Sequence, residues 1–159
     1  MAAFTLSSSI TATSTYSISV TASGGLYVLS GADKNGSVSG NNATVTVNVG
    51  DTLNFVVNAS GHPFFIKTAA TTGTGNQVST PAATNQGTQS GTVSWTPNTA
   101  GTYYYICQYH GSMVGTIIVS SATASIAHQI GAIEFKPSTA TAFVTPTFQS
   151  VTKAITGGT

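Results

Sequence analysis

The sequence predicts an all-β protein, folded as a Greek-key β-sandwich with an N-terminal strand extension and an extended C-terminal arm. Short stretches of alternating apolar and polar residues are bounded by Gly, Asn, Asp and Pro, which is typical of strands and turns. Apolar spacing of three to four residues is almost nowhere sustained over the length of a helix. The chain has 159 residues, 40% of them apolar, which is the size and composition of one compact domain.

The first strands are expected on either side of tight turns. A stretch over 11–20 alternates apolar residues with hydroxyl residues, and a second over 26–29 follows a Gly-Gly turn. Residues 31–42 are rich in turn formers and are expected to form a loop. A clean alternation over 44–49 leads through a Gly-Asp turn into an apolar run over 53–57. We expect these two strands to pair as a hairpin.

The second half of the sandwich is expected to begin with a short strand after a proline. This strand covers 64–67, and a long loop of Thr, Gly, Asn and Gln follows over 69–91. Within that loop only Val78 is suited to anchor in a core. Three further strands complete a sandwich at the regular spacing of this class: 93–95, 101–107 and 115–119.

The C-terminal segment differs in character from the sandwich. Residues 120–130 can form a short helix, and prolines then punctuate an extended stretch that cannot build its own core. Its bulky apolar residues are Phe135, Phe143, Val144 and Phe148. We therefore divide the chain into an N-terminal extension (1–42), a sandwich (43–120) and an arm (121–159). We expect the arm to contact other subunits of a repetitive assembly.

The composition excludes several function classes. Charged residues make up 4% of the chain, whereas 28 Thr and 20 Ser provide a neutral polar surface. Phosphate binding needs clustered Lys and Arg, so nucleic acid is not an expected partner. No run of 18 apolar residues is present, so we expect no membrane span. The first residues lack the basic start and apolar run of a secretory signal, although a mature secreted chain could have lost one. With three acids and no Gly-x-Ser-x-Gly motif, we expect no enzyme.

The candidate chemistry lies in one short loop. Cys107, His110 and Met113 are spaced three residues apart, and a thiolate, an imidazole and a thioether form the ligand set that copper selects. Strand alternation points the Cys107 thiol inward where the strand ends. His62 lies 45 residues upstream, at the end of another strand, and completes a set of two His, one Cys and one Met. The sequence therefore predicts a copper site.

The chain resembles the cupredoxins, the blue-copper family of plastocyanin, pseudoazurin and amicyanin. The resemblance covers 44–119 and rests on segments that agree in order: Val49-Gly50-Asp51-Thr52-Leu53 with Phe55, the His62 loop, Ala100-Gly101-Thr102-Tyr103, and Cys107-x-x-His110-x-x-Met113 followed by Val-Gly-Thr-Ile. It implies a mononuclear type 1 copper site with trigonal His62, Cys107 and His110 and a weak axial Met113. Tyr109 stands where many relatives have Pro, which would loosen the loop. The single Cys excludes a binuclear centre.

Simpler interpretations of these residues remain open. Cys107 can be a buried small hydrophobe and His62 a turn residue beside its proline. His128 has no partner motif and is expected to be exposed, and the three tyrosines at 103–105 are ordinary strand residues. Copper occupancy is also a separate question from ligand geometry, because a domain can keep such a loop for packing alone.

Three functions are compatible with these features. The favoured one is a structural surface protein, a phage capsid decoration or cement protein or a tail component, because the surface is nearly uncharged and the C-terminus resembles an arm. The alternative is a soluble blue-copper one-electron carrier, whose redox partner would dock near His110 on an apolar patch of Pro63, Phe64 and Met113. Copper storage or oxidase activity is the third, and it is weak because one mononuclear site cannot handle dioxygen alone. The location would be the virion surface for the first function, and otherwise the periplasm or the extracellular space.

Overall fold

A computed structural model describes residues 7–8, 12–121 and 126–127, and within these residues every regular element is a strand. None of the described residues belongs to a helix long and apolar enough to cross a bilayer. The strands are β1 (Ser7–Ser8), β2 (Thr15–Ser23), β3 (Leu26–Asp33), β4 (Gly36–Asn41), β5 (Val45–Asn48), β6 (Thr52–Asn58), β7 (Phe64–Lys67), β8 (Ser90–Trp95), β9 (Gly101–Cys107), β10 (Val114–Ser120) and β11 (Ile126–Ala127).

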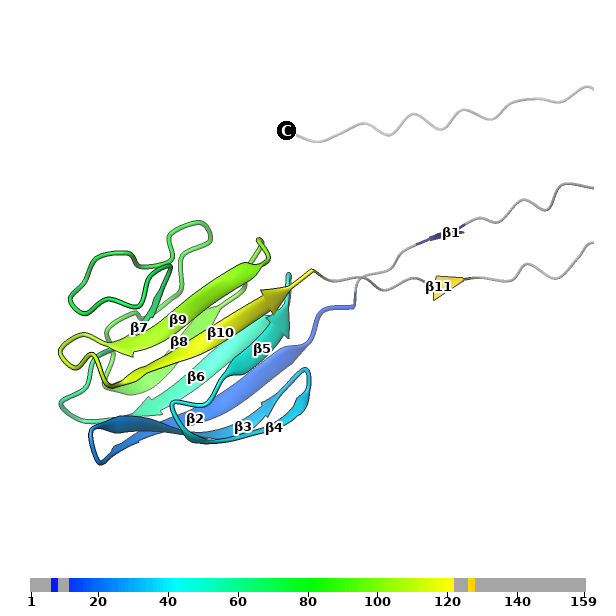
Figure 1. Cartoon of the computed structure of the whole chain (residues 1–159). Helices are drawn as coiled ribbons and strands as arrows, with labels where there is room; N and C mark the ends of the chain where they lie inside the picture. Colours follow the sequence, from blue (N-terminus) through cyan, green and yellow to red (C-terminus); the bar gives the residue numbers. More distant parts are fainter. Residues whose placement is uncertain (1–6, 9–11, 122–125, 128–159) are drawn as a thin grey trace, which may run out of the picture. The chain divides into compact units, whose positions relative to one another are not determined.

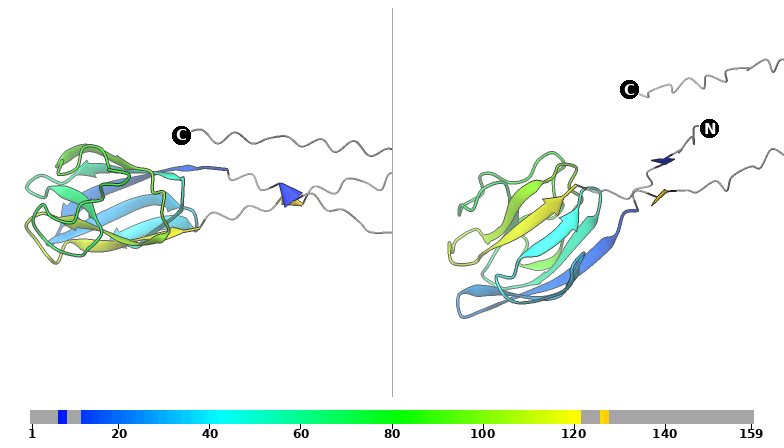
Figure 2. Two further views of the ribbon diagram at one scale, coloured as in Figure 1. Left: turned by 90° about the horizontal axis from the view of Figure 1, so that it is seen from above. Right: turned by 45° about the vertical axis from the view of Figure 1, so that its right-hand side comes forward.

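Strands β2 to β10 form two mixed sheets that face each other as a Greek-key sandwich (Figures 1 and 2). One sheet has the order β5-β10-β9-β7 and the other has the order β4-β3-β2-β6-β8. Two pairings are parallel, β5 with β10 and β2 with β6, and the others are antiparallel. The short strands β1 and β11 pair with each other.

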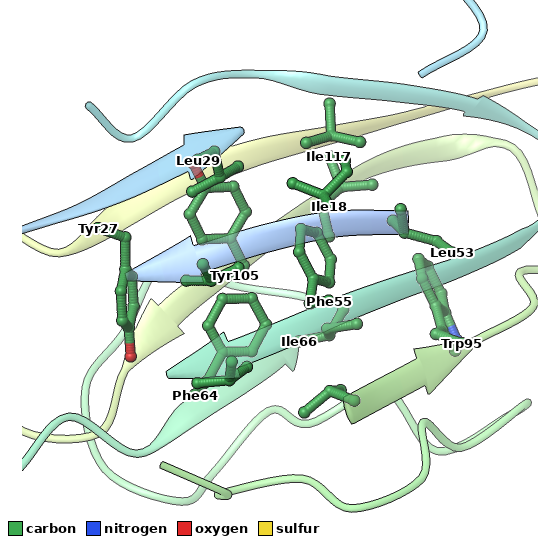
Figure 3. Close-up of a cluster of buried hydrophobic side chains, with 14 of the residues drawn as sticks. Ile18, Tyr27, Leu29, Leu53, Phe55, Phe64, Ile66, Trp95, Tyr105 and Ile117 are labelled. Atoms are coloured by element: carbon green, nitrogen blue, oxygen red, sulfur yellow. The ribbon is translucent and has the colours of Figure 1, made fainter. Parts of the chain in front are cut away.

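Both sheets contribute side chains to one hydrophobic core (Figure 3). At one end of it four aromatic rings pack together, and these belong to Tyr27, Phe55, Phe64 and Tyr105. Phe64 stacks on Tyr105 with 5.6 Å between ring centroids. Such clusters restrict ring orientation because each pair has a preferred geometry, and they bury a large apolar area. The aromatic cluster therefore gives this end of the sandwich a rigid base.

The segment after β7 covers the outer edge of that strand. The Gln86 side chain makes the two hydrogen bonds to Ile66 that a neighbouring strand would make. It accepts from the Ile66 N–H at 2.7 Å and donates to the Ile66 carbonyl at 3.1 Å. Val78 donates to the same carbonyl and is buried in the core cluster, which confirms its predicted anchoring role. This cover satisfies backbone groups that an open sheet edge would expose. The predicted loop over 69–91 is thus a tightly hydrogen-bonded layer.

The predicted hairpin connection is wrong. The strands at 44–49 and 53–57 do not form a hairpin, because β5 pairs with β10 in one sheet and β6 pairs with β2 and β8 in the other. Between them Asp51 accepts from the N–H groups of Asn48 and Ser14, so its carboxylate fixes a turn that crosses from one sheet to the other. Alternation of apolar and polar residues predicts which face of a strand is buried, but it does not predict which strand pairs with it.

The loop predicted over 31–42 and the helix predicted over 120–130 are also wrong. Most of 31–42 belongs to the β3–β4 hairpin, whose turn is fixed by Asp33 accepting from the N–H groups of Asn35 and Thr46. The apolar signal in β4 is weak because one apolar side chain faces the core and the other residues are small or polar. Ser120 ends β10 and residues 126–127 form β11. The arm beyond residue 127 lies outside the described residues.

Candidate metal centre

Three of the four predicted ligands meet at one end of the sandwich. The Nδ1 atoms of His62 and His110 are 3.2 Å apart, and the Cys107 Sγ lies 3.8 Å from the first and 3.4 Å from the second. The ligand atoms of all three side chains lie within 4.8 Å of one another. The thiol is buried, His62 is half-buried and His110 is exposed. Residues 45 positions apart in the sequence thus form one cluster.

Strand pairing explains why these residues converge. Cys107 ends β9 directly opposite Phe64, the first residue of β7, and His62 lies two residues before the start of β7. The Gln108 N–H donates to the Pro63 carbonyl at 3.0 Å, which continues the pairing just beyond the strands. The thiol and the His62 imidazole are therefore brought together by the register of two neighbouring strands.

The loop that follows Cys107 is closed on itself. The Cys107 N–H donates to the Met113 carbonyl at 3.0 Å, and the Met113 N–H donates to the His110 carbonyl at 3.1 Å. These bonds fold residues 107–113 into a compact turn that carries His110 back over the thiol. Met113 is fully buried in the core cluster at the end of this turn. Axial ligation by its sulfur stays a prediction.

The donor separations fit a metal ion bound by two nitrogens and one sulfur. With bonds of about 2.0 Å to nitrogen and about 2.3 Å to sulfur in one plane, trigonal geometry requires roughly 3.5 Å between the nitrogens and roughly 3.7 Å from each nitrogen to sulfur. The observed separations are 3.2 Å, 3.4 Å and 3.8 Å. Two imidazoles and one thiolate with a buried Met nearby favour copper, because soft ligands in trigonal geometry are typical of blue-copper sites.

Tyr109 contributes to the site through its backbone. Its N–H donates to the Cys107 Sγ at 3.5 Å, a hydrogen bond that a proline at this position could not make. The loosening of the loop expected from Tyr109 stays a prediction; in the structure the turn over 107–113 is closed and this N–H adds a further bond to it. A backbone donor to sulfur stabilises negative charge on the thiolate.

The N-terminal strands supply positioning residues that sequence reasoning missed. The Tyr27 hydroxyl donates to the His62 carbonyl at 2.9 Å. Burial, and secondarily the neighbouring Cys107 thiol, raise the pKa of Tyr27 far above its usual value, so it stays a neutral donor. Asn42 accepts from the Tyr27 N–H and donates to the Ser112 carbonyl, linking β3 to the ligand loop. The one hint in the sequence was the residue type of Asn42, because Asn tolerates the left-handed backbone conformation that Asn42 adopts here.

The surface around the site differs from the predicted apolar patch. Pro63, Phe64 and Met113 are all buried, so they form no docking surface. Exposed residues at the site include His110 and Tyr109, and Tyr109 is 62% exposed. Phe64 and Met113 belong to the hydrophobic core cluster, which explains their burial. His128 lies outside the described residues.

Fold and site together define a β-sandwich protein with a His-Cys-His cluster in position for a copper site. Residues 26–120 match the model of the copper binding proteins of the plastocyanin/azurin family, and the chain belongs to this family. Similar solved structures include rusticyanin from Thiobacillus ferrooxidans, with 26% identity, 67% of this chain and 77% of that chain covered, and a TM-score of 0.43. Reduced auracyanin from Roseiflexus castenholzii has 20% identity, coverage of 69% and 98%, and a TM-score of 0.40. None of the curated proteins compared with the chain matches it.

Proposed function

We propose that the protein is a blue-copper one-electron carrier. The observation that supports this best is the convergence of two imidazole nitrogens and one buried thiol at separations suited to a single copper ion. His62, Cys107 and His110 would hold the ion, and Met113 would be the weak axial ligand. When bound, copper supplies a one-electron couple between Cu(II) and Cu(I), taking an electron from a reduced donor and passing it to an oxidised acceptor.

The role of the polypeptide would be to keep the ligand geometry fixed. Hydrogen bonds within residues 107–113 and the Gln108 bond to the Pro63 carbonyl restrain the ligand loop, while Tyr27 restrains the backbone at His62. A restrained ligand set changes little between the two oxidation states, so less rearrangement accompanies each transfer. The exposed ring of His110 is the ligand that a partner protein would approach.

The predicted surface-lattice role has less support than the carrier. Its structural argument depends on the arm over 121–159, nearly all of which lies outside the described residues. The low charge of the chain is equally compatible with a carrier that recognises its partner through neutral groups. Light scattering on the purified protein separates the two roles, because a carrier is a small discrete particle and a lattice protein assembles into a large symmetric one.

Copper titration tests the carrier directly. Addition of one equivalent of Cu(II) to the purified protein should give an intense visible thiolate-to-copper band, which a one-electron reductant bleaches and a one-electron oxidant restores. Cys107→Ser should abolish the band because it removes the covalent copper–sulfur bond, and His110→Gln should abolish or strongly shift it. His128→Gln is the matched histidine control and should keep the band. A colourless wild-type protein, or colour that persists in Cys107→Ser, would overturn the proposal.

A further inference from the structure

Lys67 is a buried cation on the outer face of the sheet that carries the ligands. It ends β7, and its side chain has 0% exposure. Along β7 the side chains alternate, so Phe64 and Ile66 enter the sandwich core whereas Phe65 and Lys67 lie on the opposite face beneath the loop over 69–88. Burial of a lysine is rare and unfavourable unless its ammonium is well solvated by protein groups.

Two backbone carbonyls and one aromatic ring provide that solvation. The Lys67 Nζ donates to the carbonyls of Thr71 at 2.8 Å and Gly73 at 2.6 Å, and it lies 5.6 Å from the centre of the Phe65 ring. Burial lowers the pKa of Lys67, while the carbonyl dipoles and the ring face favour the charged form. The loop over 69–88 is thus held by hydrogen bonds to the Lys67 ammonium.

The carboxylates of the described residues are engaged elsewhere. Asp33 accepts from backbone N–H groups at the β3–β4 turn, and Asp51 does so at the turn between β5 and β6. Within the part of the chain that the structure describes, the acceptors of the Lys67 ammonium are therefore neutral carbonyls. No acid among the described residues cancels its positive charge, so its field acts on nearby groups.

The loop that Lys67 holds is bonded to the ligand loop. The Gly73 N–H donates to the Gln108 carbonyl at 2.7 Å, and Gln108 directly follows Cys107. The residue next to Cys107 is therefore hydrogen-bonded to the loop that the Lys67 ammonium anchors. In register, Lys67 pairs with Tyr104 and Phe64 pairs with Cys107, so three residue steps, roughly 10 Å, separate the two pairs along the strand.

We propose that Lys67 is a positioning residue for the copper site, which fixes the ligand loop through Gly73 and Gln108 and raises the reduction potential through its uncompensated charge. The inference rests on the proposed function, since it assumes that copper occupies the site. A fixed positive charge disfavours Cu(II) relative to Cu(I), because the oxidised site carries one more positive charge. Loss of the charge therefore favours the oxidised form.

Lys67→Met keeps the length and apolar stem of the side chain but removes its charge. This variant tests both the anchoring of the loop and the effect on the reduction potential. Lys67→Arg keeps the charge, and Lys34→Met is the matched control, because Lys34 donates to Asn48 at the end of β5 rather than to the loop over 69–88. In copper-free protein, amide hydrogen exchange at Gly73 should speed up at least tenfold in Lys67→Met and remain near wild type in the control. In copper-loaded protein the equilibrium constant for reduction should fall about tenfold, a downward shift of about 59 mV.

Each result decides one part of the proposal. Unchanged Gly73 exchange together with an unchanged potential in Lys67→Met would overturn it, as would an equal effect of Lys34→Met. Recovery of the wild-type potential in Lys67→Arg separates charge from packing. If Lys67→Met does not fold, Lys67→Gln replaces it, because the amide is neutral yet still donates hydrogen bonds. A wild-type protein that binds no copper would refute the proposed function, and the exchange measurement would still decide whether Lys67 anchors the loop.

Discussion

Gly115→Ala is expected to destabilise the sandwich strongly, because Gly115 leaves the space that the Tyr105 ring fills. Gly115 is directly opposite Tyr105 in the β9–β10 pairing, and a Cβ at this position would lie 2.1 Å from both Cζ and Oη of that ring. The ring has no room to move. It stacks on Phe64 and its hydroxyl donates to the Ala43 carbonyl at 2.7 Å.

The expected loss of stability is the sum of two costs, the crowding of the core and the loss of the Tyr105 hydrogen bond. Forcing a methyl group into a packed core costs about 1 to 3 kcal/mol. Breaking the buried hydrogen bond of Tyr105 costs about 1 to 3 kcal/mol more, so the free energy of unfolding should fall by roughly 2 to 6 kcal/mol. Urea denaturation of the copper-free protein measures this change. Because Gly115 follows Met113 by two residues, the visible band of the copper-loaded variant should weaken as well.

Two further variants make this reasoning refutable. Gly75→Ala is the matched control, because a Cβ at Gly75 meets nothing within 4 Å, and it should change stability by less than about 1 kcal/mol. Tyr105→Leu removes the ring atoms that clash, so Gly115→Ala should cost far less in that background than in the wild type. Equal costs in the two backgrounds, or a Gly115→Ala protein as stable as Gly75→Ala, would show that the contact with Tyr105 does not matter.

Three other predictions concern the ligands and the buried tyrosines. Tyr109→Pro removes the N–H that donates to the Cys107 sulfur, so the potential measured by voltammetry should fall, and an unchanged value would show that this bond does not tune the site. Met113→Gln should keep copper but lower the potential, and no shift would contradict axial ligation. Burial raises the pKa of Tyr27 and Tyr105 above the ordinary 10.0, so these hydroxyls ionise first in the unfolded chain. Their contribution to stability is therefore complete below about pH 10 and is lost above it, by about 1.4 kcal/mol per pH unit for each group. Urea titrations at about pH 9 and about pH 11 should show this loss, Tyr105→Phe should reduce it, and a variant with the wild-type slope would contradict it.

The candidate ligands could be proposed from the sequence because copper chemistry restricts ligands to a few residue types at short spacing. Cys107, His110 and Met113 lie within seven residues, and the structure confirms that the first two converge with His62. The strands at 64–67 and 101–107 were also predicted, since turn residues bound an apolar run in one case and an alternating run in the other. Local residue patterns were sufficient for these features.

The residues that position the site were not predictable from local patterns. Tyr27 bonds to the His62 backbone across 35 positions, and Asn42 bonds to Ser112 across 70. Neither spacing has a local signature, because each contact depends on which strands become neighbours. Lys67 is similarly deceptive, since a lysine at the end of a strand normally extends into water and is buried here by a separate loop.

The sequence by itself determined the all-β class, most strand positions and the residue types of the candidate copper ligands, because alternation, turn residues and donor chemistry are properties of short segments. The tertiary structure decided which strands pair, so the expected hairpin of 44–57 became a crossing between two sheets. It also decided that Pro63 and Phe64 are buried and that a lysine lies beneath the loop beside the site. The physical reason is that burial and pairing are set by the whole chain, which must close one core and satisfy every buried polar group at once.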